Sequence, residues 1–355
     1  MRIIHCADIH LDSALTTHLD KEKARTRRKE ILDTFRRMLV YASDNDVQAV
    51  IIAGDLFDSE MISASTINTV LGEIARHGEL EVYYLRGNHD PGISIFAGRN
   101  IPKNLHMFDE RWTYYQLNDM ADESAAHSGN DERCNIVLAG VEMTSDNKNR
   151  IYDELSLRER DVNIVTLHGQ EQEYGDAHVA EEICLDKLKD RGIDYLALGH
   201  IHRPKREKLD HRGMYVYPGC LEGRGFDECG EHGFMLIDID EATGDMNTEK
   251  LYGDVNGRED DQARALVKIT VTGDLDVESE IDMEYLARQF NDSFYYVKIA
   301  DKTDLRVDPL KYVHDATLKG EFVRMVLEQD MPEDDKAYII QTGIRALAGE
   351  EVWTR

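Results

Sequence analysis

The sequence predicts an α/β protein that is followed by a smaller α+β domain. In the first 200 residues, short β-branched apolar runs alternate with amphipathic stretches, a pattern typical of strands and helices layered on one another. The segment "DVNGREDDQA" (254–263) is rich in charge and glycine and has almost no apolar content, which is typical of a domain boundary. We therefore expect one domain at residues 1–255 and a second at 262–355.

Six apolar runs predict buried strands. They are short and rich in β-branched residues, which is typical of strands that are covered on both faces. They span residues 2–7, 49–54, 80–85, 135–143, 163–169 and 194–200. From about residue 214 the pattern changes to strand followed by strand, at "MYVYPG" and "HGFMLIDID". The polar segment 120–134 predicts a loop or a hairpin connection.

Amphipathic stretches between these runs predict the helices. Residues 30–43 place Ile31, Phe35, Met38 and Ala42 at helical spacing, and residues 64–77 form a second such stretch. Helices of this kind cover the faces of a sheet. In the second domain, 265–271 and 294–300 predict strands, and 319–329 and 332–347 predict helices.

The charge of the chain is unevenly distributed. The net charge is −28, which opposes binding to nucleic acid, because basic patches supply most non-specific affinity for phosphate backbones. Residues 21–37, "KEKARTRRKEILDTFRR", nevertheless hold eight basic and three acidic side chains, a net +5. This basic island is either a strip that tracks a phosphate backbone or a solvated helix face, and the sequence leaves both open.

Composition also bears on the compartment. No apolar run approaches the ~20 residues of a membrane helix, and "MRIIHCADIH" lacks a signal-peptide core. Five cysteines without a CxxC pair argue against a disulfide framework or a zinc ribbon. We expect a soluble, cytoplasmic protein with reduced thiols and no membrane association.

Metal-binding residue types follow five of the predicted strands. The carboxyl ends of strands in α/β sheets form binding sites. The groups are Asp8, His10 and Asp12; Asp55 and Asp58; Asn88, His89 and Asp90; His168; and His200 with His202. A lone histidine on a strand is usually a core residue, but five strand ends with such residues predict a metal site. A shared carboxylate can bridge two cations roughly 3.5–4 Å apart, and a histidine-rich set suits Mn²⁺, Fe²⁺ or Zn²⁺.

The motif order D-x-H, G-D-x-x-D, G-N-H-D, lone His and G-H-x-H resembles the calcineurin-like metallophosphoesterase superfamily. This resemblance implies a four-layer α-β-β-α sandwich. Within the superfamily, "HCADIHLDS", the Asp of "GNHD" and the later "YPGCLEGRGFDECG" are similar to the SbcD-type DNA repair nucleases. Cys220, where serine is commoner, points to the shorter, YhaO-like exonuclease branch.

The resemblance also implies roles for these residues. Two divalent ions, Mn²⁺ first, would clamp a phosphodiester and activate a hydroxide for in-line attack. His89 would stabilise the transition state or protonate the leaving oxygen. Arg224 would meet a substrate phosphate or form a structural salt bridge. The implied ligands are Asp8, His10 and His202 for one metal; Asn88, His168 and His200 for the other; Asp55 as bridge; and Asp58 and Asp90 behind the imidazoles.

Three functions stay open. The first is a metal-dependent DNA exo- or endonuclease in DNA repair, and the second is a nucleotide or small-molecule phosphodiesterase. The third is a nuclease subunit that depends on an SMC-like, SbcC-type ATPase and docks through residues 262–355. A face on the first of its predicted helices would serve that docking: Phe322, Val323, Val326 and Leu327. The apolar residues of 21–44 would either form a homodimer or be buried in the chain's own core.

Overall fold

The computed structural model describes residues 1–15, 21–58, 62–118, 134–172, 182–226, 228, 230–252, 266–290, 294, 296–312 and 314–347. The chain divides into two compact units, Met1–Arg258 and Glu259–Arg355. The boundary predicted between 255 and 262 lies outside the described residues, as does nearly all of the loop predicted at 120–134.

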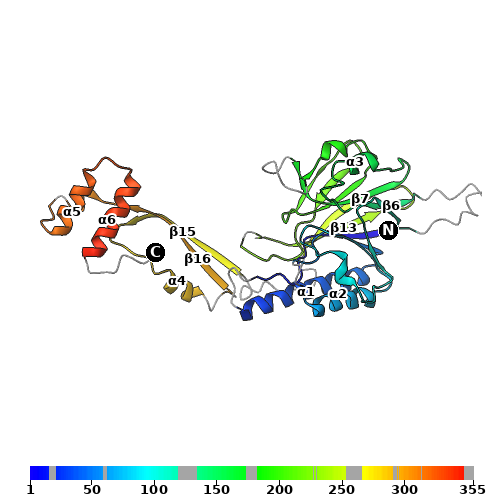
Figure 1. Ribbon diagram of the computed structural model, residues 1–355, viewed down its shortest axis with the longest axis horizontal. Helices are drawn as coiled ribbons and strands as arrows, with labels where there is room; N and C mark the ends of the chain where they lie inside the picture. Colours follow the sequence, from blue (N-terminus) through cyan, green and yellow to red (C-terminus); the bar gives the residue numbers. More distant parts are fainter. Residues whose placement is uncertain are drawn as a thin grey trace, which may run out of the picture. The chain divides into compact units, whose positions relative to one another are not determined.

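The first unit contains two six-stranded sheets (Figure 1). The first sheet has the order β14 (Met246–Tyr252), β13 (Gly233–Ile239), β1 (Arg2–Cys6), β2 (Ala49–Ala53), β3 (Glu81–Leu85), β4 (Leu105–Met107). The second has the order β11 (Lys205–Lys208), β12 (Met214–Tyr217), β10 (Tyr195–Gly199), β7 (Val162–His168), β6 (Ile136–Gly140), β5 (Thr113–Gln116). Strands β1 to β4 run parallel, and so do β6, β7, β10 and β12. In each sheet these strands therefore end at a common edge.

Four layers result from the alternation of side chains along the strands. Helices α1 (Lys21–Asp44) and α2 (Ala64–Arg76) cover the outer face of the first sheet, where Phe35 packs with Ile4 and Ile52. The opposite face, with Ile3 and Ile51, packs against the second sheet. In the described residues, the outer face of the second sheet is covered by short elements: α3 (Ile151–Glu154), η3 (Leu185–Lys187), β8 (Gln170–Glu171) and β9 (Glu182–Ile183). The predicted α-β-β-α fold is confirmed, with a thin fourth layer. A further short helix, η1 (Ile93–Phe96), follows β3.

The apolar face of α1 packs inside the chain. Ile31, Phe35, Met38 and Ala42 are at most 2% exposed and belong to the core beneath the helix. A homodimer through this face would require these side chains to leave their own core. The prediction of dimerisation through these four residues of 21–44 is therefore wrong, and the alternative, burial in the chain's own core, is confirmed.

His5 is a buried titratable group between the two sheets. Its Nδ1 lies 2.9 Å from the Tyr195 hydroxyl, and its Nε2 has no hydrogen-bond partner among the residues that the structure describes. Burial lowers the pKa of His5 to about 3, so the ring stays neutral in the fold at pH values where the unfolded chain is protonated. The unfolded state then binds more protons below pH 6.5, and stability falls as the pH drops from there towards 3.

We expect this histidine to make the fold acid-sensitive. When the pH falls from 7.5 to 5.5, protonation of His5 in the unfolded chain should lower the free energy of unfolding of the wild type by about 1.4 kcal/mol. His5→Phe, which cannot titrate, should lack this component. Urea unfolding of both chains at the two pH values measures it. An identical pH dependence in the two chains would show that His5 makes no such contribution.

The second unit has its own small core. Strands β15 (Leu266–Asp276) and β16 (Tyr296–Arg306) pair in parallel, and α4 (Met283–Phe290) lies between them in sequence. Then come η5 (Pro309–Lys311), α5 (Leu318–Leu327) and α6 (Glu333–Leu347). Val323 and Val326 are buried with Tyr312 and Ile340, and Phe322 and Leu327 pack against them. The groove-binding face predicted on this helix is thus used inside the unit, and that expectation is corrected.

Within the described residues, no helix combines the length and apolar character needed to cross a lipid bilayer. The four described cysteines are free thiols: Cys6, Cys134, Cys184 and Cys220.

Candidate metal centre

The seven predicted metal ligands lie at the carboxyl ends of strands from both sheets. Asp8 and His10 follow β1, Asp55 follows β2 and Asn88 follows β3. His168 is the last residue of β7, and His200 and His202 follow β10. Hydrogen-bond-range contacts and close groups of donor atoms connect all seven side chains. The two sheets meet so that their ligand-bearing ends face one site.

The backbone at this site is strained. Asp8, His10, Asp55 and His200 have φ values of 52°, 50°, 52° and 98°, in the left-handed region that costs non-glycine residues about 1–3 kcal/mol each. Backbone hydrogen bonds hold these loops in place. Asp8 N–H donates to the Gly54 carbonyl at 3.1 Å, and His10 N–H to the Asp55 carbonyl at 2.9 Å. Such strain is typical of functional sites.

Two glycines permit the close packing of the ligands. Gly54 has φ 96°, and a Cβ there would lie 1.9 Å from Nδ1 of His168. A Cβ on Gly87 would lie 2.3 Å from Oδ1 of Asp55. Any side chain at either position would displace a predicted ligand, so contact requires glycine at both positions, and at Gly54 the left-handed backbone favours it as well.

The first cluster consists of Asp8, His10 and His202, whose ligand atoms lie within 4.8 Å of one another. Nδ1 of His10 donates to Asp58 at 2.9 Å, and Nδ1 of His202 donates to Glu228 at 2.6 Å. Both Nε2 atoms are then lone-pair acceptors, yet they lie only 3.1 Å apart. Two facing lone pairs repel unless a cation lies beside them. Burial lowers the pKa of His10, which favours its neutral, metal-binding form.

The second cluster consists of Asn88, His168 and His200. Nδ1 of His168 donates to the Ala53 carbonyl at 2.9 Å, which turns Nε2 towards Oδ1 of Asn88, at 3.0 Å. Nδ1 of His200 lies 3.2 Å from the same amide oxygen. Burial lowers the pKa of His168, but the hydrogen bond and charge of Asp55 outweigh it and raise the value to about 9. Here too, electron-rich atoms converge on a point that favours positive charge.

One oxygen of Asp55 faces both clusters. Its Oδ2 lies 3.7 Å from Nε2 of His10 and 3.3 Å from Nε2 of His168, while Oδ1 accepts the N–H of His89 at 2.8 Å. Burial raises the pKa of this carboxyl, but His168 and His10 outweigh that and keep the pKa well below its ordinary value. The mixed nitrogen and oxygen donors fit two divalent cations on either side of a shared carboxylate.

His89 is the accessible polar group beside these clusters. Its side chain is 49% exposed, and Nδ1 lies 3.2 Å from Oδ1 of Asp58. Asp58 therefore contacts two imidazoles, those of His10 and His89. The ligand atoms of the three residues also lie within 4.8 Å of one another, so His89 is close enough to act at the same reacting centre.

Among the described residues, the contacts of the Asp90 carboxylate are to backbone N–H groups and not to an imidazole, contrary to the expectation for it. Its carboxylate accepts backbone N–H groups of Gly87 and Phe57 at 2.8 Å and of Leu56 at 3.3 Å. It therefore ties the loop after β3 to the loop after β2. This bond network holds the two ligand-bearing loops together without orienting a ligand ring.

Glu228 is a site residue that the sequence reasoning missed. Its side chain is 7% exposed, accepts from His202, and also binds Arg224. Arg224 bridges Glu228 at 3.0 Å and Asp58 at 3.1 Å, so one guanidinium connects the carboxylates behind His202 and His10. Of the two roles open for Arg224, these contacts support the structural salt bridge. Glu228 lies in the stretch "YPGCLEGRGFDECG" that is similar to the SbcD-type nucleases, which is the signal in the sequence that points to it.

We expect Glu228→Gln to weaken metal binding by about 10–100-fold, the usual effect of losing a partner behind a ligating imidazole. The amide can present its NH₂ to Nδ1 of His202 and so disturb the tautomer that aims Nε2 at the site. Mn²⁺ titration by calorimetry measures the affinity. Glu81→Gln is the matched control, because Glu81 binds His106 at 2.5 Å at the amino end of β3. Equal affinities for both variants would show that Glu228 does not orient a ligand.

Comparisons with known proteins agree with this geometry. Residues 1–204 match the family model described as calcineurin-like phosphoesterase. The chain is 26% identical over 265 residues to the DNA double-strand break repair protein Mre11 of Methanopyrus kandleri, covering 68% of this chain and 54% of that protein. It is 26% identical over 256 residues to the uncharacterized metallophosphoesterase YhaO of Bacillus subtilis, covering 70% and 59%.

A third relative is a component of the SbcCD nuclease of Bacillus subtilis, 24% identical over 266 residues, covering 65% of this chain and 64% of that protein. The chain thus spans between 54% and 64% of the length of these three relatives. The resemblance noted in the sequence is confirmed. Because the family model covers more than half of the 355 residues, this chain belongs to the calcineurin-like phosphoesterase family.

Proposed function

We propose that this protein is a two-metal phosphodiesterase that cleaves DNA. The observation that carries the proposal is the convergence of nitrogen and oxygen atoms that can ligate metal at the strand ends. Asp58, Glu228 and the Ala53 carbonyl hold three imidazoles in the tautomer that points Nε2 into the site. The names of two relatives, a DNA double-strand break repair protein and a component of a nuclease, favour DNA over other phosphodiesters.

The proposed ligand sets follow the two clusters. Asp8, His10 and His202 would hold one ion, and Asn88, His168 and His200 the other. Asp55 would bridge them, since its Oδ2 faces both. When bound, two such ions polarise a phosphoryl oxygen and lower the pKa of a water molecule. Mn²⁺ is the ion that we propose first, and Fe²⁺ and Zn²⁺ suit the same donors.

His89 supplies the proton chemistry in this proposal. It is exposed, and Asp58 holds its Nδ1, which leaves Nε2 of the protonated ring to donate a proton to the leaving oxygen or to stabilise the negative charge that develops on the phosphoryl oxygens. Asp58 and Glu228, joined by Arg224, keep the ligand rings in position. These residues lie behind the rings and are positioning groups.

The direct test measures metal content and cleavage together. The chain purified with Mn²⁺ should hold two ions by elemental analysis and should cut a linear DNA duplex. Removal of the ions with a chelator should stop cleavage, and Mn²⁺ should restore it. A chain that binds two ions and hydrolyses bis(p-nitrophenyl) phosphate but never DNA would instead support a nucleotide or small-molecule phosphodiesterase, which the net charge of −28 also favours.

A nuclease subunit that needs an ATPase is the other candidate. It is supported by the printed name of the SbcCD relative and by exposed apolar side chains in the second unit, Leu318, Met325 and Tyr338. Addition of an SbcC-type ATPase with ATP distinguishes it. DNA cleavage that appears only with the ATPase identifies a dependent subunit, and unchanged behaviour identifies the small-molecule enzyme.

A further inference from the structure

The basic side chains of α1 have two different environments. Arg27 donates to Glu222 at 2.7 Å and to the Gly223 carbonyl at 2.5 Å. Arg28 donates to the Ala14 carbonyl at 2.9 Å, and Arg36 to Glu73 at 3.0 Å. These three cations attach the helix to the rest of the first unit. Much of the basic island is therefore internal structure, and not a free charged face.

Arg25 and Lys29 differ from these anchors. They stand one turn apart on the same side of α1, and both are exposed. Among the residues that the structure describes, neither has a carboxylate within ion-pair distance. Both line a cavity of about 640 Å³, together with Arg28, Thr66 and Leu11. The cavity therefore presents two uncommitted cations.

The same cavity contains two acidic side chains, Asp12 and Glu22. The carboxylate of Asp12 accepts from Ser63 N–H at 2.8 Å and from the Thr66 hydroxyl at 3.1 Å. Its charge is thus partly satisfied at the start of α2. With Arg25, Arg28 and Lys29 against these two, the part of the lining that the structure describes has a net charge of +1, in a chain of net charge −28.

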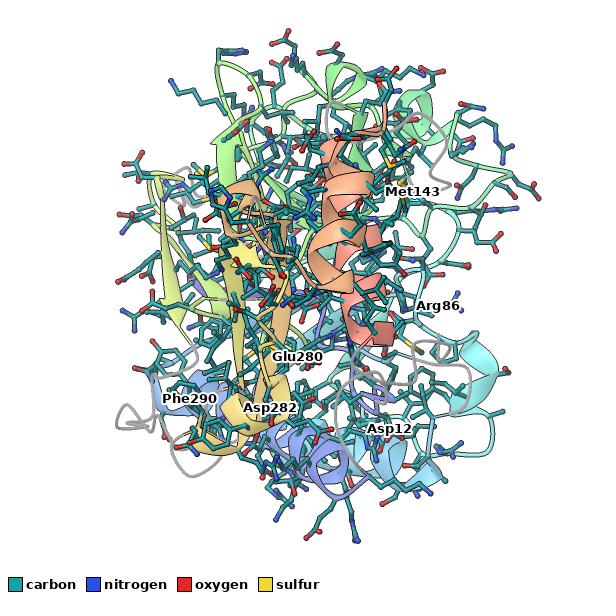
Figure 2. All side chains as sticks on the ribbon, turned by 90° about the vertical axis from the view of Figure 1, so that its left-hand side faces the viewer. Asp12, Arg86, Met143, Glu280, Asp282 and Phe290 are labelled. Atoms are coloured by element: carbon teal, nitrogen blue, oxygen red, sulfur yellow. The ribbon has the colours of Figure 1, made fainter. Side chains whose placement is uncertain are left out.

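This cavity lies next to the metal centre. Leu11 and Asp12 follow His10 directly, and two trans peptide units span at most about 7.6 Å between Cα atoms. Asp12 is labelled in Figure 2, where it lies near the ribbons of α1 and α2. The lining of the cavity therefore begins one residue beyond a proposed metal ligand, in the same loop after β1.

We infer that Arg25 and Lys29 form a binding site for a backbone phosphate of a polynucleotide, next to the phosphodiester held at the metal centre. The inference rests on the proposed function and extends it. Ammonium and guanidinium groups bind phosphate without reading bases, so the site serves sequence-independent binding. A small diester has no second phosphate to place there, so the cavity favours polymers over small substrates.

Binding without turnover tests the site. Fluorescence anisotropy of a labelled DNA duplex, with a chelator present, gives Kd over a series of salt concentrations. Arg25→Gln and Lys29→Gln should each weaken binding about fivefold and reduce the salt slope by about 0.9, the loss of one phosphate contact. Lys103→Gln is the matched control. Lys103 is an exposed lysine that lies before the amino end of β4, whereas the metal centre lies at the carboxyl ends of the strands. This variant should change neither quantity.

Hydrolysis of bis(p-nitrophenyl) phosphate with Mn²⁺ checks the metal centre in the same variants. Unchanged hydrolysis together with weakened DNA binding supports the site. DNA binding equal to wild type, or a loss shared with Lys103→Gln, overturns it, and so does a wild-type chain that binds no DNA. Hydrolysis lost in the variants also overturns it, because the side chains would then act on the metal centre. A wild type that binds DNA but cleaves no diester refutes the proposed function; weakened binding by Arg25→Gln and Lys29→Gln would then support only phosphate binding by these two cations, without a place beside a reacting phosphodiester.

Discussion

Asp55→Asn is expected to leave the chain unable to hold two divalent ions and to lower phosphodiester hydrolysis by about 10³-fold. The charge of Asp55 is shared between the clusters, because Oδ2 faces both His10 and His168. An amide at this position has half the acceptor capacity and no charge with which to bridge two cations. A loss of several kcal/mol of transition-state stabilisation corresponds to this rate change. Elemental analysis and the hydrolysis rate are measured on the same sample.

Asp46→Asn is the control for this variant. Asp46 also has a left-handed backbone, with φ 55° against 52° for Asp55, but it lies before β2, at the other end of the strand. The same change of charge at the same kind of backbone should leave metal content and rate unaffected. Two ions bound to the Asp55→Asn chain with near-normal affinity would refute the bridging role.

His89→Gln is expected to lower kcat on DNA by about 10²–10⁴-fold and to leave two ions bound. The range is that of general acid catalysis, and it applies because His89 lies beside the clusters with Nδ1 held by Asp58. His211→Gln is the control, since His211 is exposed and its Nδ1 lies 3.1 Å from Asp190, a similar pair at another place.

The leaving group separates a general acid from a merely structural histidine. A p-nitrophenolate departs without protonation, whereas the alkoxide of a DNA strand needs a proton. The loss in His89→Gln should therefore be much smaller with bis(p-nitrophenyl) phosphate than with DNA. Equal losses on both substrates would point to transition-state stabilisation, the other role proposed for His89. A loss of bound metal would instead identify His89 as a ligand, together with His10 and Asp58.

The sequence predicted most strands of the first unit from local pattern alone. Runs such as "AVIIA" became β2, buried along its whole length, because continuous apolar character requires cover on both faces. The strands β4, β5, β8, β9, β11 and β14 were not predicted. β11, "KREK", is largely exposed and pairs with β12 through backbone hydrogen bonds, which leave no apolar pattern to read.

The partners behind the ligands were less accessible to sequence reasoning. Asp58 follows Asp55 within one motif, and its expected contact with an imidazole is present at His10. Glu228 meets His202 across 26 positions, and Arg224 meets Asp58 across 166. Contacts over such separations depend on how the loops are placed, which no local pattern encodes.

By itself the sequence determined the donor types, their order and their place at strand ends, because those depend on residues close together in the chain. The tertiary structure decided the contacts between residues that are far apart in the chain, because those depend on long-range packing. It divided the strands between two sheets and brought His10 within 3.1 Å of His202, 192 positions away. It also buried the apolar face of α1 in the chain's own core. Hydrophobic pattern shows that a side chain is buried, but only the packed fold shows which side chain buries it.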